Sequence, residues 1–318
     1  MKKHFALLGL IAVEVVVFNL ISAPPLGSIG DALNYFGSYF ADILSQSAPI
    51  LCLAFGMTLV LMTAGIDLSV ASLTALVACV MASLDGGGGS FWVTALPVGL
   101  ALAIGLGITN GLLIAWLDLP PIIATLGTMI FYRGWCFVVM GDAEKPFLVP
   151  GYEVLGEFWF VLGCVVLLYG IGSAYLTRSR WLQEILFIGG NRVAARYAGL
   201  RVGWRLCQVY AFVGGLAFLA ALSFTARNGS VSGSALLGTE LQVIVAVVLG
   251  GTRVQGGRGS LIGSFLGVLV IAILDEGLRS SVRWGDAYLP FRVSHLQFIL
   301  LGLLLVLGVW INSRPRRS

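Results

Sequence analysis

The chain has 318 residues, of which 58% are apolar and 11% are charged, with a formal net charge of +4. Soluble domains carry about 25% charged residues, and a water-soluble fold of this length could not hide so much apolar surface. The composition therefore excludes an ordinary soluble enzyme or binding protein. It predicts an all-α membrane protein, because lipid can cover the apolar side chains.

Runs of about 20 apolar residues predict membrane-spanning helices. Ten candidates follow one another, at residues 5–23, 47–64, 68–84, 91–117, 121–140, 159–176, 206–226, 239–250, 261–274 and 296–311. The eighth and ninth are short, so either could be broken or re-entrant. No segment between the candidates is long enough for a second domain, and we expect residues 1–318 to form one transmembrane domain.

The basic residues indicate the orientation, because cytoplasmic segments of membrane proteins carry an excess of Lys and Arg. Ten crossings from a cytoplasmic N-terminus place most of them inside, namely Lys2, Lys3, Arg178, Arg180, Arg192, Arg196, Arg201, Arg205, Arg253, Arg258, Arg314, Arg316 and Arg317. Outside lie Lys145, Arg227, Arg279, Arg283 and Arg292, and Arg133 falls within a span. The pattern predicts a multi-pass inner-membrane protein with both termini in the cytoplasm.

The N-terminal segment has a second interpretation. Lys2 and Lys3 before an apolar run could begin a cleaved signal peptide. Glu14 inside the run, and the Pro24-Pro25 pair that follows it, favour a first membrane span instead.

Motifs of the common enzyme classes are absent from the sequence. No lysine follows Gly and precedes Ser or Thr, as a Walker A loop requires, so the chain has no ATP-hydrolysing site of that kind. The two histidines lie at opposite ends, and the cysteines lack metal-ligand spacing and are interpreted as packing residues. We expect no catalytic residue, cofactor or metal, and transport is the default role.

Small residues recur at four-residue spacing in the fourth and ninth spans. Gly99, Ala103, Gly107 and Gly111 lie on one helix face, and Gly259, Gly263 and Gly267 repeat the pattern. Such ridges favour tight helix packing; a sliding conduit wall is the alternative.

Residues 56–69 combine a helix end with an acidic residue. Gly65 is suited to end a helix in the left-handed conformation, and Asp67 to cap the next helix by accepting its free N–H groups. An ionised Asp in lipid costs several kcal/mol, so Asp67 is expected at the interface or in a protected break. Capping is the favoured role, and gating or lining of a path is the alternative.

The loop at residues 177–204 is the longest predicted cytoplasmic segment. Asn191 is a good N-cap and Gly199 a good C-terminal stop, which predicts a two-turn helix with arginines and small residues between them. A short, basic, projecting helix is suited to docking a partner, or alternatively to lying on anionic lipid.

Glycine-rich breaks flank the apolar half-length helix at 239–250, with Glu240 and Gln242 at its outer end. Interruptions at membrane depth are tolerated only where protein or water covers the backbone. This region is therefore a candidate for the solute path.

Together these segments resemble the membrane permeases of bacterial ABC sugar importers of the ribose, xylose and galactofuranose type. Four blocks match in order: Gly56-Met57-Thr58 through Gly65-Ile66-Asp67-Leu68-Ser69; Asn110-Gly111-Leu112 with Thr125-Leu126-Gly127-Thr128 and Arg133-Gly134; Gly189-Gly190-Asn191 with Ala194-Ala195 and Gly199; and Glu240-Leu241 through Gly250-Gly251 with Gly256-Gly257. Departures are Ala64 and Ala71, where the family usually has Gly, and Arg253-Val254-Gln255, which replaces a smaller stretch.

The resemblance implies an ABC importer permease fold and a set of partners. Two permease chains, identical or paralogous, would form the pore in the lipid bilayer, cytoplasmic ATPase subunits would drive it, and a periplasmic binding protein would deliver a monosaccharide. The ATPase-coupling segment would comprise Gly189, Gly190, Asn191, Arg192, Ala194, Ala195, Arg196 and Gly199. The candidates for structural or pathway roles are Asp67, Ser69, Asn110, Thr125, Glu240 and Gln242. No nucleic acid is implied.

Other transport classes provide the alternatives. A related permease could carry autoinducer-2 or branched-chain amino acids, although the Gly-Ile-Asp-Leu-Ser block favours the sugar group. An ion-coupled secondary transporter would need intramembrane ionisable groups. Glu14, Asp67, Glu240 and Arg133 are few and mostly near span ends, which disfavours that class.

Overall fold

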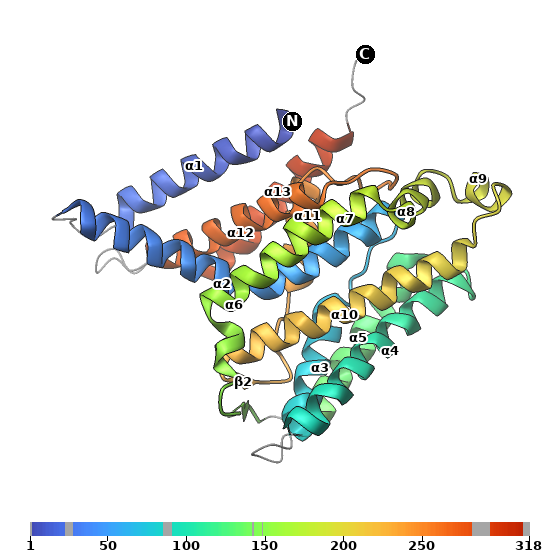
Figure 1. Ribbon diagram of the computed structural model, residues 1–318, viewed down its shortest axis with the longest axis horizontal. Helices are drawn as coiled ribbons and strands as arrows, with labels where there is room; N and C mark the ends of the chain where they lie inside the picture. Colours follow the sequence, from blue (N-terminus) through green and yellow to red (C-terminus); the bar gives the residue numbers. More distant parts are fainter. Residues whose placement is uncertain are drawn as a thin grey trace.

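The computed structural model describes residues 2–22, 28–84, 91–141, 143–147, 149–281 and 293–313, most of them in helices (Figure 1). The longer helices are α1 (Lys2–Ser22), α2 (Ile29–Met62), α3 (Val70–Leu84), α4 (Leu96–Ala115), α5 (Pro121–Met140), α10 (Val202–Asn228), α11 (Thr239–Leu249), α12 (Leu261–Ser281) and α13 (Val293–Ser313). Shorter elements are η1 (Phe91–Ala95), η2 (Glu153–Gly156), α6 (Phe158–Val165), η3 (Val166–Gly172), α7 (Ser173–Arg178), α8 (Arg180–Gly190), α9 (Arg192–Tyr197) and the strands β1 (Lys145–Pro146) and β2 (Ser230–Val231).

Six helical segments in the described part of the chain are long and apolar enough to cross a membrane. They are Ile29–Met62, Phe91–Ala115, Pro121–Met140, Phe158–Arg178, Val202–Asn228 and Leu261–Leu278. Four shorter apolar helices, His4–Phe18, Val70–Leu84, Thr239–Leu249 and Leu296–Trp310, match the other predicted spans. The chain is thus an all-α membrane protein, whereas ten crossings remain a prediction.

Two helices have other bounds than the apolar runs predicted. α2 begins at Ile29, well before residue 47, because the Ser28 hydroxyl accepts a hydrogen bond from the Asp31 N–H and starts the helix among polar residues. α12 continues past residue 274, through Asp275 and Glu276. The prediction of a short segment is therefore confirmed for α11, with 11 residues, and wrong for α12.

α2 and α10 form the centre of the bundle. The apolar window of α2 is 89% buried and that of α10 is 61% buried, against 28% for α5 and 22% for the α6–α7 segment. Exposed apolar side chains such as Ile130 and Val138 on α5 would face water in a soluble protein. They suit a lipid-facing surface, which places α4 to α7 at the periphery.

Glycines let neighbouring helices of the bundle approach each other closely. A Cβ at Gly107 of α4 would lie 2.3 Å from the carbonyl oxygen of Tyr210 on α10. A Cβ at Gly263 of α12 would lie 2.1 Å from the carbonyl oxygen of Gly250, just after α11. The interpretation of the small-residue ridges as packing surfaces is confirmed.

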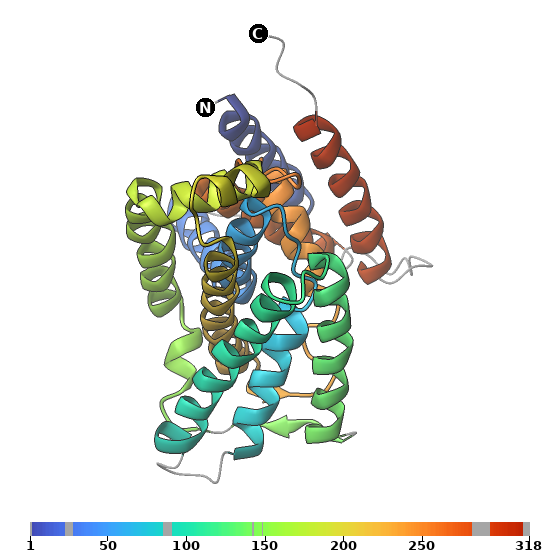
Figure 2. The ribbon, with the colours of Figure 1, turned by 90° about the vertical axis from the view of Figure 1, so that its right-hand side faces the viewer.

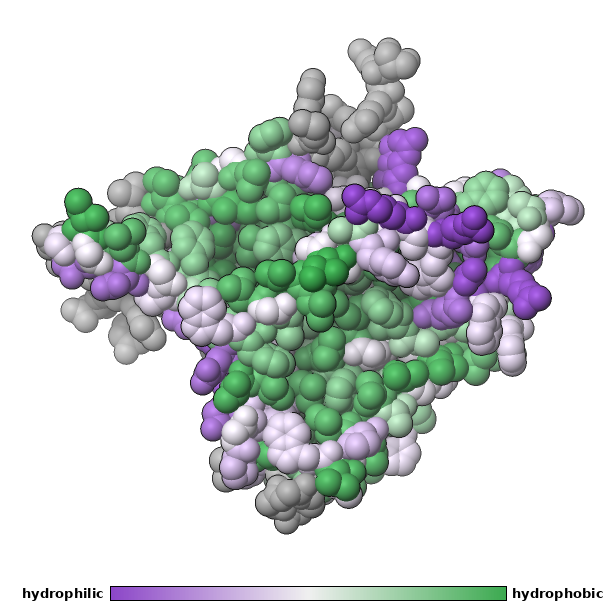
Figure 3. Space-filling model, in the orientation of Figure 1, coloured by the Kyte–Doolittle hydropathy of each residue, from purple (hydrophilic) through white to green (hydrophobic). Residues whose placement is uncertain are grey.

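The two ends of the bundle differ in character. Hydrophilic residues gather at the end that carries α8 and α9, beside a broad apolar surface (Figures 1 and 3). The opposite end carries the antiparallel β1–β2 pair, in which Lys145 lies opposite Val231. α13 stands at the edge of the bundle, packed on α11 (Figure 2).

Candidate functional site

The break between α2 and α3 covers residues 63–69, and its left-handed residue is Ala64, with φ of 61°. The prediction that Gly65 takes this conformation is wrong. Gly65 instead stands where a side chain has little room, because a Cβ there would lie 3.1 Å from the Tyr210 hydroxyl. The glycine therefore allows close packing of the break against α10.

Asp67 is 1% exposed and holds the break rather than the first turn of α3. Its Oδ1 accepts hydrogen bonds from the Ser69 N–H at 2.9 Å and from the Ser69 hydroxyl at 2.6 Å. The Ser69 carbonyl in turn accepts the hydrogen bond of the Leu73 N–H, so Ser69 is the residue at which α3 begins. Direct capping by Asp67 is wrong; the carboxylate forms a local turn that positions Ser69.

The same polar network joins three helices. Asn110 of α4 donates to the Ser69 hydroxyl at 2.8 Å and accepts from the Thr128 hydroxyl of α5 at 2.7 Å. Thr125, one turn earlier on α5, donates to the Ile66 carbonyl at 3.0 Å. The structure thus brings together four predicted candidates, Asp67, Ser69, Asn110 and Thr125, as a buried brace around the break.

A cavity of about 660 Å³ lies elsewhere, among α2, α10, α11 and α12. Its polar lining consists of Gln46, Ser47, Ser223, Arg227, Asn228, Ser234, Thr239, Gln242, Asp275 and Glu276. Gln242 is therefore the predicted candidate that faces a cavity, while Glu240 is outside its lining. Pockets for small molecules usually have about 300–1,000 Å³, so the volume suits a small solute.

The segment before α11 is fixed by Arg133, the basic residue within α5. The Arg133 Nη1 donates to the carbonyl oxygens of Gly233 and Ala235, at 2.9 and 2.7 Å. Backbone carbonyls are acceptors that an intramembrane guanidinium can use in place of water. The sequence shows that Arg133 lies within a span, but it does not indicate that the side chain binds backbone carbonyls.

α9 is the predicted short helix between Asn191 and Gly199. The Asn191 Oδ1 accepts a hydrogen bond from the Ala194 N–H at 3.0 Å, and Gly199 ends the turn with φ of 82°. Both predicted caps are confirmed. Val193 and Tyr197 are 61% and 90% exposed, and Arg196 is exposed beside them, so α9 presents an apolar and basic surface to its surroundings.

The inner side of this segment is packed against the bundle. Ala195 is fully buried. A Cβ at Gly189, the penultimate residue of α8, would lie 1.8 Å from the Met62 carbonyl oxygen, whereas Gly190 has open space. Ala194 and Arg192 are half-buried. The coupling candidates thus divide into exposed residues and residues packed inward, among which Gly189 meets the end of α2.

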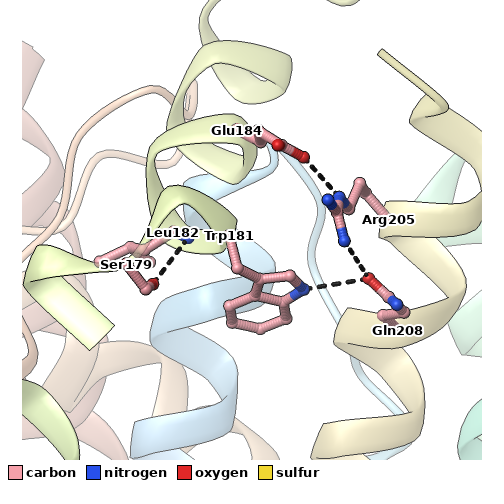
Figure 4. A network of polar contacts seen from close by, with 6 residues as sticks. All are labelled: Ser179, Trp181, Leu182, Glu184, Arg205 and Gln208. Atoms are coloured by element: carbon pink, nitrogen blue, oxygen red, sulfur yellow. Dashed lines mark hydrogen bonds and ion pairs between the residues drawn. The ribbon is translucent and has the colours of Figure 1, made fainter. Parts of the chain in front are cut away.

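A polar network that the sequence analysis missed joins α8 to the first turns of α10 (Figure 4). Glu184 forms an ion pair with Arg205, which also donates to the Gln208 Oε1 at 2.9 Å. The Trp181 indole N–H donates to the same oxygen at 3.1 Å. Glu184 is the only acidic residue in the otherwise basic 177–204 segment. This feature of the sequence could have indicated an ion pair here.

No group of three His, Cys, Asp or Glu side chains that could hold a metal occurs in the described part of the chain. The five cysteines are free thiols, and all except Cys164 are buried. They serve as small packing side chains in this structure.

Comparisons with known proteins agree with this architecture. Residues 39–309 match the family model described as branched-chain amino acid transport system / permease component. The chain is 32% identical to the ribose import permease protein RbsC of Escherichia coli (strain K12), over 99% of this chain and 94% of that protein. It is 34% identical to the Bacillus subtilis (strain 168) ribose import permease, over 86% of this chain and 84% of that protein.

A third relative has another named cargo. The chain is 32% identical to the autoinducer 2 import system permease protein LsrC of Salmonella choleraesuis (strain SC-B67), over 77% of this chain and 72% of that protein. No solved structure matches the chain. The family match over most of the chain, the two kinds of import permease among its relatives, and the helical bundle identify it as a member of the branched-chain amino acid transport system permease family and as an ABC importer permease.

Proposed function

We propose that this chain translocates a monosaccharide across the inner membrane by alternating access, driven by separate ATPase subunits. The observation that carries the proposal is the pairing of a polar cavity among α2 and α10–α12 with an exposed basic helix, α9, at the other end. A solute site at one end and a docking element at the other are the two parts that such a subunit requires.

The cavity lining suits an uncharged, hydroxylated solute. Amides and hydroxyls both donate and accept hydrogen bonds, and Gln46, Asn228 and Gln242 supply amides. The charged lining residues are Arg227, Asp275 and Glu276, an acidic excess that opposes an anion. Few strong ligands are needed, because cargo must also leave the site.

We propose that the exposed face of α9 docks in a groove of the ATPase. Ala195 does not test this, since a large side chain at a fully buried position would disturb the loop itself. Tyr197→Ala is the sharper variant, because Tyr197 is 90% exposed. It should leave the melting temperature unchanged and weaken co-purification of the ATPase; unchanged co-purification and uptake would contradict this role.

At the opposite end, we propose that charge guides a periplasmic binding protein. Asp42, Glu153, Glu157 and Arg227 line a surface pocket of about 290 Å³ near η2. Such a patch orients a partner of complementary charge and speeds encounter, and salt weakens it. Of the basic residues that the sequence predicts on the same side, Arg283 and Arg292 lie outside the described residues.

The orientation that follows places both termini, α8 and α9 in the cytoplasm and the β1–β2 end outside. A second permease chain, identical or paralogous, would complete the pore. Cysteine labelling from one side of sealed vesicles at Tyr197 and Glu153 tests this arrangement directly.

Uptake into proteoliposomes containing the permease, its ATPase and its binding protein tests the cargo and the energy source. Labelled ribose should accumulate with ATP and not with an imposed proton or sodium gradient. Accumulation driven by an ion gradient without ATP would overturn the proposal.

Autoinducer-2 is the second candidate cargo, favoured by the similarity to a named autoinducer 2 import permease. Competition experiments separate these solutes. Uptake of labelled ribose is measured with unlabelled autoinducer-2 and, separately, with leucine, a zwitterion, as competitors.

A further inference from the structure

One short helix, α8, lies at the far ends of the helices that line the cavity. It meets α2 at Met62, α10 at Arg205 and Gln208, and the loop that joins α11 to α12 at Gly256 and Gly257. α8 precedes α9 by a single residue, Asn191. α8 therefore lies between the exposed docking surface and the cavity walls formed by α2, α11 and α12, whereas α10 follows α9 directly in the chain.

The contact with α2 and the α11–α12 loop consists of backbone on backbone. The Gly257 N–H donates to the Met62 carbonyl at 3.0 Å. A Cβ at Gly189 would lie 1.8 Å from that carbonyl oxygen and 2.8 Å from the Gly257 nitrogen. A Cβ at Gly256 would lie 2.7 Å from the Gly189 carbonyl oxygen. At Gly189, Gly256 and Gly257 these three segments meet without a flexible side chain between them, and we call this contact the glycine junction.

The two helices that the loop joins, α11 and α12, are themselves closely packed. Gly250 and Gly263 meet closely at the start of the α11–α12 contact, and a Cβ at Gly267 would lie 2.0 Å from the Ala246 carbonyl oxygen. α2 and α12 are further joined by a hydrogen bond of 2.6 Å between the hydroxyls of Thr58 and Ser264. Close-packed contacts of this kind transmit displacement rather than absorbing it.

The contact with α10 has different chemistry. Glu184, Arg205, Gln208 and Trp181 form the side-chain network of Figure 4. Such a network can yield by rotamer changes, unlike the glycine junction. α10 carries Ser223, Arg227 and Asn228 of the cavity wall, so this wall is tied to α8 by the more compliant link.

We infer that α8 is the transmission element of the permease and that Gly189 is its main positioning residue, coupling displacement of α9 to α2, α11 and α12 as one body. The inference rests on the proposed function for the source of that displacement. According to this inference, the cavity changes shape mainly because α2, α11 and α12 move together relative to α10.

The test measures the cavity directly instead of uptake. Gln242→Cys introduces a thiol in the cavity lining, and its labelling rate by a water-soluble maleimide is measured in the reconstituted complex, with and without a non-hydrolysable ATP analogue. The analogue should change that rate about fivefold or more, in the range of ordinary coupling between sites. Adding Gly189→Ala should abolish the change.

The matched control is Gly107→Ala. A Cβ at Gly107 is as crowded against backbone, at 2.3 Å from the Tyr210 carbonyl oxygen, but belongs to the α4–α10 contact. It should lower the melting temperature while keeping the nucleotide effect on labelling. If Gly189→Ala keeps the full effect, or if both variants lose it equally, Gly189 is not a transmission contact.

A second pair guards against misfolding of Gly189→Ala. Gln208→Ala removes the acceptor shared by Trp181 and Arg205, while the exposed Gln183→Ala on α8 does not. Gln208→Ala should reduce the nucleotide effect partly and Gln183→Ala not at all; equal effects would overturn the role of α8. A wild-type complex that shows the nucleotide effect but takes up no sugar would refute the proposed cargo and leave this inference standing. A wild-type complex without the nucleotide effect would refute the proposed ATP-driven mechanism and this inference together.

Discussion

The buried brace around the break and the cavity among α2 and α10–α12 both place hydroxyls and amides inside an apolar bundle, yet they differ in how those groups are satisfied. Asp67, Ser69 and Asn110 are at most 1% exposed and bond to one another across α3 and α4. Gln46 in the cavity lining is exposed. Polar groups bonded within the chain build the scaffold, and polar groups left open to a cavity are available to a solute.

Asn110→Leu should have the largest effect, on stability. It removes the donor to Ser69 and the acceptor of Thr128 in a fully buried site, and stranding such groups costs about 2–3 kcal/mol. Thermal unfolding in detergent should show a marked fall in melting temperature, with less protein in the membrane. A normal melting temperature combined with lost uptake would instead assign the brace to the solute path.

Asp67 gives a finer separation within the brace. Asp67→Asn keeps the Oδ1 acceptor of both Ser69 hydrogen bonds, so most stability and uptake should remain. Asp67→Ala removes it and should cost about 1–3 kcal/mol. Melting temperature, membrane expression and uptake are compared for the pair. If both variants fold normally and neither transports, the charge itself acts in gating.

The helices were predictable from sequence where the signal is local. The apolar runs gave the helical segments, and Asn191 and Gly199 gave α9, because a cap acts within one turn. α2 was predicted too short because its start depends on the Ser28–Asp31 cap in a polar stretch. Gly65 was assigned the wrong conformation because its close approach to Tyr210 is a tertiary contact.

The site was less predictable, because its contacts join distant parts of the chain. Residue type and the family resemblance together grouped Asp67, Asn110, Thr125 and Gln242 as candidates, and neither contains anything that separates a brace from a cavity wall. Gln208 and Arg205 meet Trp181 and Glu184 only after α8 folds back on α10.

Gln242→Leu sharpens the comparison from the cavity side. It should lower sugar uptake about three- to tenfold. The free energy of unfolding should change by no more than about 0.5 kcal/mol, because Gln242 lies outside the buried hydrogen-bond networks. The matched position is Glu240, two residues earlier and outside the cavity lining, where Glu240→Gln should leave uptake near normal. Equal losses of uptake in both variants would indicate that α11 matters as a whole rather than through its cavity face.

Ala64→Gly should have the smallest effect, in the stabilising direction. Ala64 lies in the break with φ of 61°, and a left-handed conformation costs an L-residue about 1–2 kcal/mol relative to glycine. Glycine gives part of this back through its greater freedom in the unfolded chain, so a net gain of about 0.5–1 kcal/mol is expected. Ala64 is exposed, so the lost methyl group removes little packing. Ala71→Gly is the matched control, because Ala71 is fully buried in α3 and glycine in a helix costs about 1 kcal/mol. The same chemical change should therefore raise the melting temperature at one position and lower it at the other, with uptake unchanged at Ala64. Two shifts of the same sign would mean that the break does not hold Ala64 in the left-handed conformation.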